Sequence, residues 1–415
     1  MQNWAGNFNY SAVRIANPRS VDELAAVVTV GGPVRALGTR HSFNDIADSS
    51  GLLVTLDEMP RDISIDESER IVWAPAGLRY GDLAEHLQAR GWALHNLASL
   101  PHISLAGTVA TGTHGSGTRN GSLATAVAAI ELMTARGELI TLARGDDVFD
   151  GAVVSLGSLG IVTRLALDIQ PAFEINQRVY LDLSLDTVAE NLRDVLALGY
   201  STSLFTTWTK ATVDQLWVKS LGAEAPAETF GGTAAAQKMH PIAGVDAVNA
   251  TDQLGVPGPW LDRLPHFKLD FTPSAGEEIQ SEFFVPAESG AEALKALAGL
   301  AELIAPVLFV SEIRAIAADD LWLSGAYGQD TIAFHFTWHS RPDEVLPVVG
   351  AIEQALIPFG VRPHWGKVFT MDSAQIHPLY PHVDRFLALR ERMDPDDVFR
   401  NVYLDRVLLG TSDAP

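Results

Sequence analysis

The stretch from Leu97 to Gly121 constrains this chain more than any other part of its sequence. It reads LASLPHISLAGTVATGTHGSGTRNG, mostly glycine, serine, threonine and small apolar residues, with Arg119 as its one charge. Few of its side chains compete for its backbone amides, and those amides need partners wherever they are buried. The stretch therefore predicts either a Gly-rich ordered connection or a cradle that wraps a ligand.

Short helical and extended patterns surround this stretch. Ser20-Val21-Asp22-Glu23 resembles a capping box before an apolar run, which predicts a helix that ends at the Gly31-Gly32-Pro33 breaker. A second helix is expected over 80–90, stopped by Gly91. Strands are expected over 34–37, 52–56 and 71–74, in a hairpin of 128–134 with 138–143, and from residue 160 onward.

The sequence pattern changes near Pro171, and this change predicts that a second domain begins there. A length of 415 residues corresponds to two or three domains at about 150 residues each. Amphipathic helices are expected near 185–198, 291–304 and 343–356, with strands over 311–317 and 331–338. The predicted fold class is α+β (α/β), with a first domain over 1–172 and a second over 173–372.

Composition excludes several function classes. Lys plus Arg minus Asp plus Glu is 29 − 51 = −22, which repels nucleic acid and anionic membrane surfaces. Because the chain has no cysteine, disulfides, thiolate nucleophiles and iron–sulfur clusters are excluded, and redox chemistry would need an organic cofactor or a metal held by His and carboxylates. The start, MQNWAGNFNYS, has no signal-peptide pattern, and the most apolar window, 296–310, is too short to cross a bilayer, so a cytoplasmic protein is expected.

Common nucleotide and hydrolase motifs do not fit. The nearest match to GxGxxG, residues 115–121, is one residue too long, and the nearest Walker A match, residues 360–367, has five intervening residues instead of four. Neither HExxH nor GxSxG occurs.

Three segments could instead carry chemistry together. Gly38-Thr39-Arg40-His41-Ser42-Phe43-Asn44 directly follows an expected strand and would present a histidine at the strand's end, although alone it could be a surface turn. The amides of the 97–121 stretch could wrap a pyrophosphate or ring carbonyls. Gly157-Ser158-Leu159-Gly160-Ile161-Val162 is a tight turn into a strand.

In this order, the GTRHSFN turn, ASLPHISLAGTVATGTHGSG and SLGSLGIVT resemble the FAD-binding domain of the vanillyl-alcohol oxidase flavoprotein family, in its alditol (xylitol) oxidase branch. The resemblance extends over nearly the whole chain, through NWAGN, GVPGPW, LPHFK and RPHWGKVFT. It implies a two-subdomain FAD-binding domain over 1–172 that is completed by 373–415, and a mixed-sheet substrate domain between them.

The resemblance also implies a cofactor site, with FAD bonded covalently through its 8α-methyl group to His41. Arg40 could hold a flavin phosphate or could be solvated. The implied FAD cradle comprises Gly38, Thr39, Arg40, His41, Ser42, Ser99, Ser104, Gly107, Thr111, Gly112, Thr113, His114, Gly115 and, at the adenine end, Ile161.

A substrate face is implied in the second domain, made of Ser99, Gln280, Glu312, Arg314, His335, Thr337 and Lys367. Spacing supports it independently, because Glu312 and Arg314 at i, i+2 on a strand share a face, as do His335 and Thr337. Interleaved donors and acceptors of this kind suit a polyol, in which each hydroxyl both donates and accepts.

The implied reaction is FAD-dependent oxidation of the C1 hydroxyl of an alditol such as xylitol or sorbitol to the aldose, with hydride transfer to flavin N5 and reduction of O2 to H2O2. The expected catalytic residues are Lys367, Arg314, His335 and Glu312, with no metal. The proton acceptor for O1 is left open between Lys367, which needs a pKa lowered by burial, and His335. The alternatives are a sugar-1,4-lactone oxidase or dehydrogenase of the same family and a non-catalytic sugar-binding protein. A monomer is expected.

Overall fold

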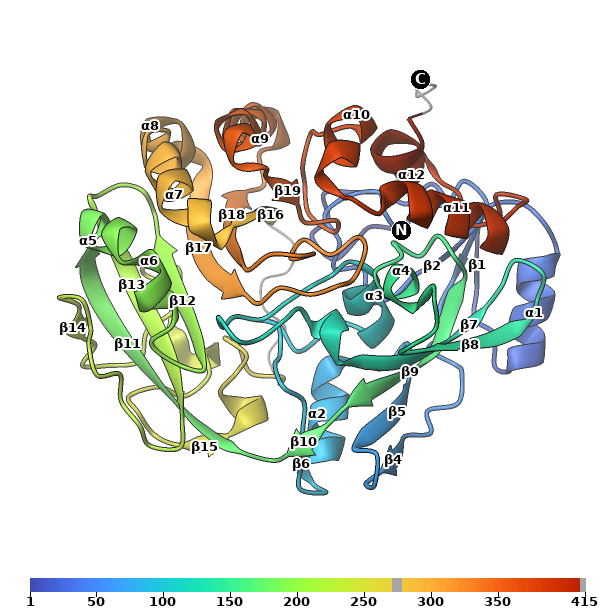
Figure 1. The fold of residues 1–415 in the computed structure, drawn as a ribbon, viewed down its shortest axis with the longest axis horizontal. Coiled ribbons are helices and arrows are strands. Elements are labelled where there is room, and N and C mark those ends of the chain that lie inside the picture. The colour runs from blue at the N-terminus through green and yellow to red at the C-terminus, as the bar shows by residue number, and fades with distance from the viewer. Residues whose placement is uncertain (271–277, 411–415) are drawn as a thin grey trace.

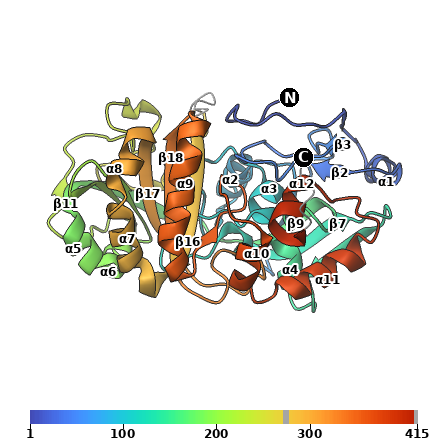
Figure 2. The ribbon, with the colours of Figure 1, turned by 90° about the horizontal axis from the view of Figure 1, so that it is seen from above.

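The computed structural model describes residues 1–270 and 278–410. Two lobes lie side by side: strands and helices within residues 1–171 form most of one, and a large sheet with helices on one face forms the other. Elements near the C-terminus return to the first lobe, where the N-terminus also lies (Figure 2). Among the described residues, no helix is long and apolar enough to span a bilayer.

The first lobe contains a small parallel sheet. Its strand order is β1 (Arg14–Ala16), β3 (Leu52–Val54) and β2 (Val34–Ala36), joined by α1 (Val21–Thr29). The Ser20 side chain caps α1 by accepting from the Glu23 N–H at 3.1 Å, as predicted, but the Glu23 carboxylate accepts from the Arg19 N–H instead of closing the box on Ser20.

A five-stranded antiparallel sheet forms the rest of this lobe, in the order β4 (Ser64–Asp66), β5 (Ile71–Pro75), β9 (Ile161–Asp168), β7 (Val127–Met133) and β8 (Leu139–Ala143). The predicted hairpin is the β7–β8 pair. Helices α2 (Tyr80–Gln88), α3 (Leu105–Ala110) and α4 (Phe149–Val153) belong to this lobe, with a short pair of β6 (Trp92–Ala93) and β10 (Gln170–Pro171). The 97–121 stretch is thus an ordered connection that contains α3.

The second lobe is built on a nine-stranded antiparallel sheet. Its order is β14 (Thr233–Ala234), β11 (Glu174–Ser184), β13 (Thr212–Leu221), β12 (Ser201–Thr206), β17 (Leu308–Ile316), β18 (Thr331–His339), β16 (Glu278–Pro286) and β19 (Arg362–Pro363), and β15 (Gly258–Pro259) also pairs with β11. Its helices are α5 (Leu185–Glu190), α6 (Leu192–Leu196), α7 (Gly290–Ala298), α8 (Ala301–Ile304) and α9 (Pro342–Leu356).

The two faces of this sheet differ in chemistry. Ile313, Phe334 and Phe336 pack with the helices in one apolar core. Because side chains alternate across a strand, the residues between them point to the opposite face, toward the first lobe. That face carries charged and polar side chains that are nevertheless buried, including Glu312 and His335.

The C-terminal part comprises α10 (Ser373–Ile376), α11 (Val383–Met393) and α12 (Val402–Leu404), followed by a π-helical turn over Asp405–Leu409. Ile376, Phe386 and Leu404 share an apolar core with Leu83 and Leu165 of the first lobe. This packing accords with a first domain completed by the C-terminal segment, while the boundaries at 172 and 372 stay a prediction. Short 3-10 turns cover Leu123–Ala126, Ala247–Asn249, Trp260–Asp262, Ala287–Ser289, Ala305–Val307, Ile357–Phe359 and His377–Leu379.

Candidate active site

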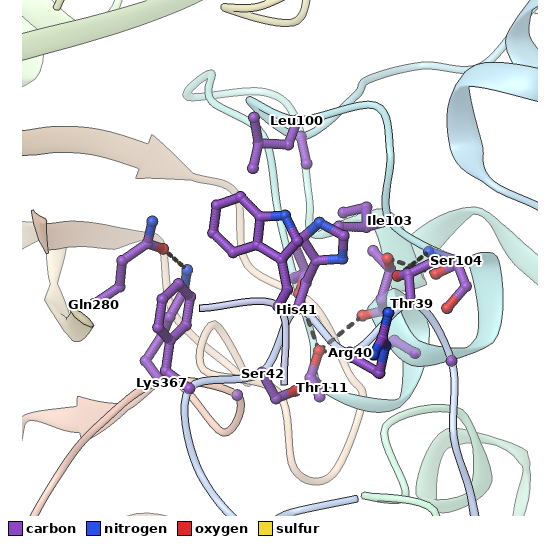
Figure 3. A pocket seen from close by; sticks show the side chains of 18 of the residues that line it. Thr39, Arg40, His41, Ser42, Leu100, Ile103, Ser104, Thr111, Gln280 and Lys367 are labelled. Carbon is purple, nitrogen blue, oxygen red and sulfur yellow. Dashed lines mark hydrogen bonds between the residues drawn. The ribbon is translucent and has the colours of Figure 1, made fainter. Parts of the chain in front are cut away.

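A cavity of about 650 Å³ lies between the two lobes and is lined from both. Figure 3 shows the turn around His41 and the segment around Ser104 on one side, with Gln280 and Lys367 on the other. The cavity brings together most of the predicted site residues: Gly38, Thr39, Arg40, His41, Ser42, Ser99, Ser104, Gly107, Thr111, Thr113, His114, Gln280, Glu312, Arg314, His335, Thr337 and Lys367.

Three predicted cofactor residues do not line this cavity. Ile161 is fully buried in an apolar cluster with Met133 and Phe399, although its neighbours Gly160 and Val162 both line the cavity. The side chain of Ile161 therefore serves the core, and a contact with a ligand would be left to the backbone. Gly112 and Gly115 lie in the wall behind the lining residues; a Cβ on Gly115 would approach the Leu97 carbonyl oxygen to 2.5 Å.

The 38–43 turn and the Ser104 segment approach each other closely. The Ser104 N–H donates to Thr39 Oγ1 at 3.1 Å. A Cβ on Gly38 would come within 2.4 Å of Ser104 Oγ, so that a larger residue there requires the Ser104 side chain to move. Arg40 has a φ of 64°, an uncommon conformation for a residue with a side chain. The turn therefore directs its backbone and His41 into the cavity at some conformational cost.

His41 has the properties of a neutral nucleophile. Its ring stacks on Trp4, with centroids 5.0 Å apart and an interplanar angle of 22°. Burial lowers the pKa of His41 to about 4, with smaller contributions from His102 and Lys367, so the imidazole is uncharged at neutral pH. Its Nδ1 is buried and makes no hydrogen bond of good geometry to a described residue, while the Thr39 backbone raises the pKa of the ring slightly against the effect of burial. This nitrogen is therefore available to a bound group.

Strands β16, β17 and β18 place the opposite wall. The sheet register sets Glu282 beside His335 and His335 beside Glu312, in one row across three strands. The next row sets Gln280 beside Thr337. The shared face expected from the i, i+2 spacing is present, since both rows line the cavity.

Glu282 is a site residue that the sequence analysis missed. Its Oε1 lies 2.6 Å from Arg314 Nη2 and 3.1 Å from His114 Nε2, and the side chain is buried. Burial opposes ionisation, but Arg314 and His114 outweigh it and hold the pKa of Glu282 well below its usual value. Glu282 is two residues from Gln280 on the same strand, so the alternation that indicated Glu312 with Arg314 could also have indicated it.

Gln280 connects three other polar residues that line the cavity. Its Nε2 donates to Glu278 Oε1 at 2.5 Å, which leaves Oε1 as an acceptor. Lys367 Nζ donates to that oxygen (Figure 3). His335 Nε2 lies 3.1 Å from the same oxygen. Because the oxygen only accepts, His335 carries its proton on Nε2.

The two candidate bases differ in pKa. Burial lowers the pKa of Lys367 to about 8, opposed by the nearby carboxylate of Glu282. Burial lowers the pKa of His335 to about 3. Lys367 can therefore exchange a proton near neutral pH, whereas His335 stays neutral and acts as a fixed hydrogen-bonding group.

The residues present fit FAD. Glycine-constrained backbone around Gly38 and Gly107 could hold an extended ligand, His41 offers an unpaired nitrogen, and Gly157 and Gly160 line the same cavity. The polar row on the sheet faces His41 across the cavity, where a hydroxylated substrate could bind.

Comparison with known proteins agrees with this geometry. A profile described as FAD binding domain matches residues 12–143, and one described as D-arabinono-1,4-lactone oxidase matches residues 275–407. The chain is 45% identical to an alditol oxidase from Streptomyces sp. over 98% of this chain and 99% of that one. It is 31% identical to an L-gulono-1,4-lactone dehydrogenase from Mycobacterium tuberculosis over 98% of both. A solved cholesterol oxidase from B. sterolicum shares the fold, with a TM-score of 0.78 at 14% identity over 98% of this chain and 96% of that one.

Proposed function

The chain belongs to the vanillyl-alcohol oxidase-type FAD flavoprotein family that was expected from its motifs, and on this premise we propose that it is an FAD-dependent alditol oxidase. The observation that carries the proposal is the row of alternating donors and acceptors on β16, β17 and β18 that faces His41 across the cavity. FAD, when bound, supplies the hydride acceptor and returns the electrons to O2, giving H2O2.

Lys367 is the proposed base for the substrate's O1 hydroxyl. Its lowered pKa of about 8 leaves a useful fraction of neutral amine near pH 7, and its Nζ is held by Gln280. Arg314 stabilises the negative charge that develops on O1. His335, Glu312 and Ser99 orient the hydroxyls at O2 and O3, with Gln280 and Thr337 completing the polar wall.

His41 is the proposed attachment site, through a bond from an imidazole nitrogen to the flavin 8α-methyl carbon. A neutral ring with an unpaired Nδ1 supports this assignment. Arg40, at the exposed end of the turn, and the backbone amides of 104–107 would hold the phosphates. The cytoplasmic location and the monomeric state stay predictions.

A sugar-1,4-lactone oxidase or dehydrogenase is the second candidate, because the profile over 275–407 carries a lactone oxidase description. The deciding experiment compares xylitol, sorbitol and L-gulono-1,4-lactone, each assayed for peroxide under air and for reduction of an artificial acceptor. Peroxide formed fastest from an alditol supports the proposal, and preference for the lactone contradicts it.

Cofactor attachment is tested separately. The acid-precipitated protein should keep its yellow flavin absorbance, and His41→Ala should release it into the supernatant. His377→Ala, remote from the cavity, is the control. A colourless wild-type protein would leave only the non-catalytic alternative.

A further inference from the structure

Next to Glu312 lies a chain of buried titratable groups that the proposed reaction does not use. Lys219 on β13 and His266, which follows the Trp260–Asp262 turn, have 1% and 4% of their surface exposed. Lys219 contacts His266, which itself lines the cavity, and His266 contacts Glu312. Burying a lysine and a histidine is costly, so the arrangement requires a reason.

Lys219 has all its hydrogen-bonding capacity directed at one segment. Its Nζ donates to the carbonyl oxygen of Leu264, lies 3.3 Å from that of Pro265, and lies 3.2 Å from His266 Nδ1. An ammonium has three N–H bonds, which match these three acceptors.

The contacts also fix the tautomer of His266. Its Nε2 lies 2.8 Å from Glu312 Oε1. Arg314 and His266 overcome the effect of burial and keep the pKa of Glu312 well below its usual value, so the carboxylate only accepts. The proton of His266 therefore lies on Nε2, and its Nδ1 accepts from Lys219.

His266 also joins the two walls of the site. Its backbone N–H donates to the Ser99 carbonyl oxygen at 3.1 Å, and Ser99 lies on the 97–121 stretch of the first lobe. The ring packs edge-on against Phe205 and Trp217, with centroids 5.5 and 5.2 Å away. The imidazole is thus held in its plane by packing and in its tautomer by hydrogen bonds.

We propose that Lys219 and His266 are positioning residues for the polyol site, which hold the Glu312 carboxylate in one orientation as an acceptor for a substrate hydroxyl. The inference rests on the proposed alditol oxidase function. Glu312 Oε1 also lies 3.6 Å from Arg314 Nε. Without the His266 bond, the carboxylate is free to turn toward Arg314, which withdraws it from the substrate and disturbs the Arg314–Glu282 pair.

The test compares His266→Gln with His266→Leu. Glutamine offers one N–H donor for Glu312 and one oxygen acceptor for Lys219, whereas leucine has similar bulk and neither. Because a hydrogen bond to a charged group is lost, His266→Leu should raise KM for xylitol about 10- to 100-fold with a smaller change in kcat, and His266→Gln should recover most of it. Lys219→Met should also raise KM. In the double variant Lys219→Met/His266→Leu, the loss of binding free energy should be smaller than the sum of the losses in the two single variants.

A control separates positioning from general loss of structure. His377→Leu removes the imidazole of a half-buried histidine that lies 2.6 Å from the Leu408 carbonyl oxygen and does not line the cavity, and should leave KM unchanged. FAD content is measured for each variant. If His266→Leu fails to load FAD, the KM values of Lys219→Met and His266→Gln are compared instead.

A readout without substrate keeps the inference distinct from the proposed function. A downfield N–H proton resonance from His266 bonded to Glu312 should be visible in the FAD-loaded wild type, absent in His266→Gln and moved in Lys219→Met, whereas any such resonance from His114 beside Glu282 should remain in both variants. If no alditol is oxidised by the wild type, the proposed function fails while this resonance still reports on the Glu312 contact. Equal impairment of His266→Gln and His266→Leu, or an unchanged KM in both Lys219→Met and His266→Leu, would overturn the positioning role.

Discussion

The pH dependence of the reaction offers the sharpest test of Lys367 as the base. A base must be deprotonated to act, so activity should rise with pH through the pKa of Lys367, about 8. An amine with that pKa is about one-tenth neutral at pH 7 and about nine-tenths neutral at pH 9. The value of kcat/KM for xylitol should therefore increase about tenfold between these two pH values and then level off.

The structure also predicts how the rising limb of this pH profile shifts when a neighbouring charge is removed. Burial is the main cause of the lowered pKa, and the carboxylate of Glu282 opposes it by stabilising the ammonium. Glu282→Gln should therefore shift the limb of kcat/KM to lower pH. Glu288→Gln, on the exposed turn after β16, removes the same charge far from the amine and should leave the limb in place.

Lys219 is the competing explanation, because burial lowers its pKa to about 7. Lys219→Met should keep a limb near pH 8, whereas Lys367→Met should lose both the limb and most of the activity. Stopped-flow measurement of flavin reduction under anaerobic conditions isolates this step from reoxidation by O2. The reasoning is refuted if activity falls as pH rises through 8, which is the behaviour of a lysine needed as a cation, or if the limb survives in Lys367→Met.

Three further predictions concern the cradle and stability. Gly38→Ala should reduce FAD content, since its Cβ would meet Ser104 Oγ at 2.4 Å, and adding Ser104→Gly should restore FAD content, as measured by absorbance per protein. Glu282→Ala leaves buried Arg314 with the Glu312 carboxylate and the more distant Ser99 hydroxyl, and should lower the free energy of unfolding by about 3 kcal/mol in denaturant titrations; Glu282→Gln should lower it by less. Acidification from pH 7 to pH 5 should lower the unfolding free energy by about 2 kcal/mol for each buried histidine whose folded pKa is lowered to about 4 or 3, because the unfolded chain takes up the proton first; an unfolding free energy that is flat over this range would contradict it. Three such histidines, with pKa values of about 4, 3 and 3, are His266, His335 and His364, and His41, at about 4, joins them only where no flavin is bonded to its ring.

Local sequence patterns predicted helices and strands well where the apolar residues follow a single period. The 34–37 and 52–56 patterns became β2 and β3, and the hairpin formed as β7 and β8. Two long helical patterns were each broken in two, at Asn191 between α5 and α6 and at Gly299-Leu300 between α7 and α8. Amphipathic spacing continues across these breaks, so it cannot report a local change of backbone direction.

Helix α3 was missed for a different reason. Residues 105–110, LAGTVA, combine glycine with β-branched residues, which have low helix propensity. The helix forms where the Thr108 Oγ1 donates to the Ser104 carbonyl oxygen and Leu105 and Val109 are buried in the core. Tertiary packing outweighs propensity here, and no pattern within the stretch shows that packing.

The residues of the candidate site also differ in whether a local pattern could predict them. The i, i+2 spacing gave Glu312 with Arg314 and His335 with Thr337 from single strands. Lys219 and His266 could not be found in this way, because their relation to Glu312 depends on which strands are neighbours and on the path of an irregular segment. Strand order and register across the sheet are properties of the folded chain that no single strand encodes.

The charge of the site is a local property that the total of −22 does not describe. The polar wall and the lysine beside it hold three carboxylates, Glu278, Glu282 and Glu312, against three cations, Arg314, Lys219 and Lys367, so the charge of these six groups is −3 + 3 = 0 with both lysines protonated and −2 with neither. Because burial brings the pKa values of both lysines close to neutral pH, this charge stays near zero at pH 7 and becomes negative as the pH rises. A near-neutral polar wall has no net field with which to attract an ionic substrate, while each of its groups still offers a strong hydrogen bond. Recognition by such a wall depends on matching hydroxyl donors and acceptors one by one, and that requirement makes the fixed orientation of Glu312 consequential for an uncharged polyol.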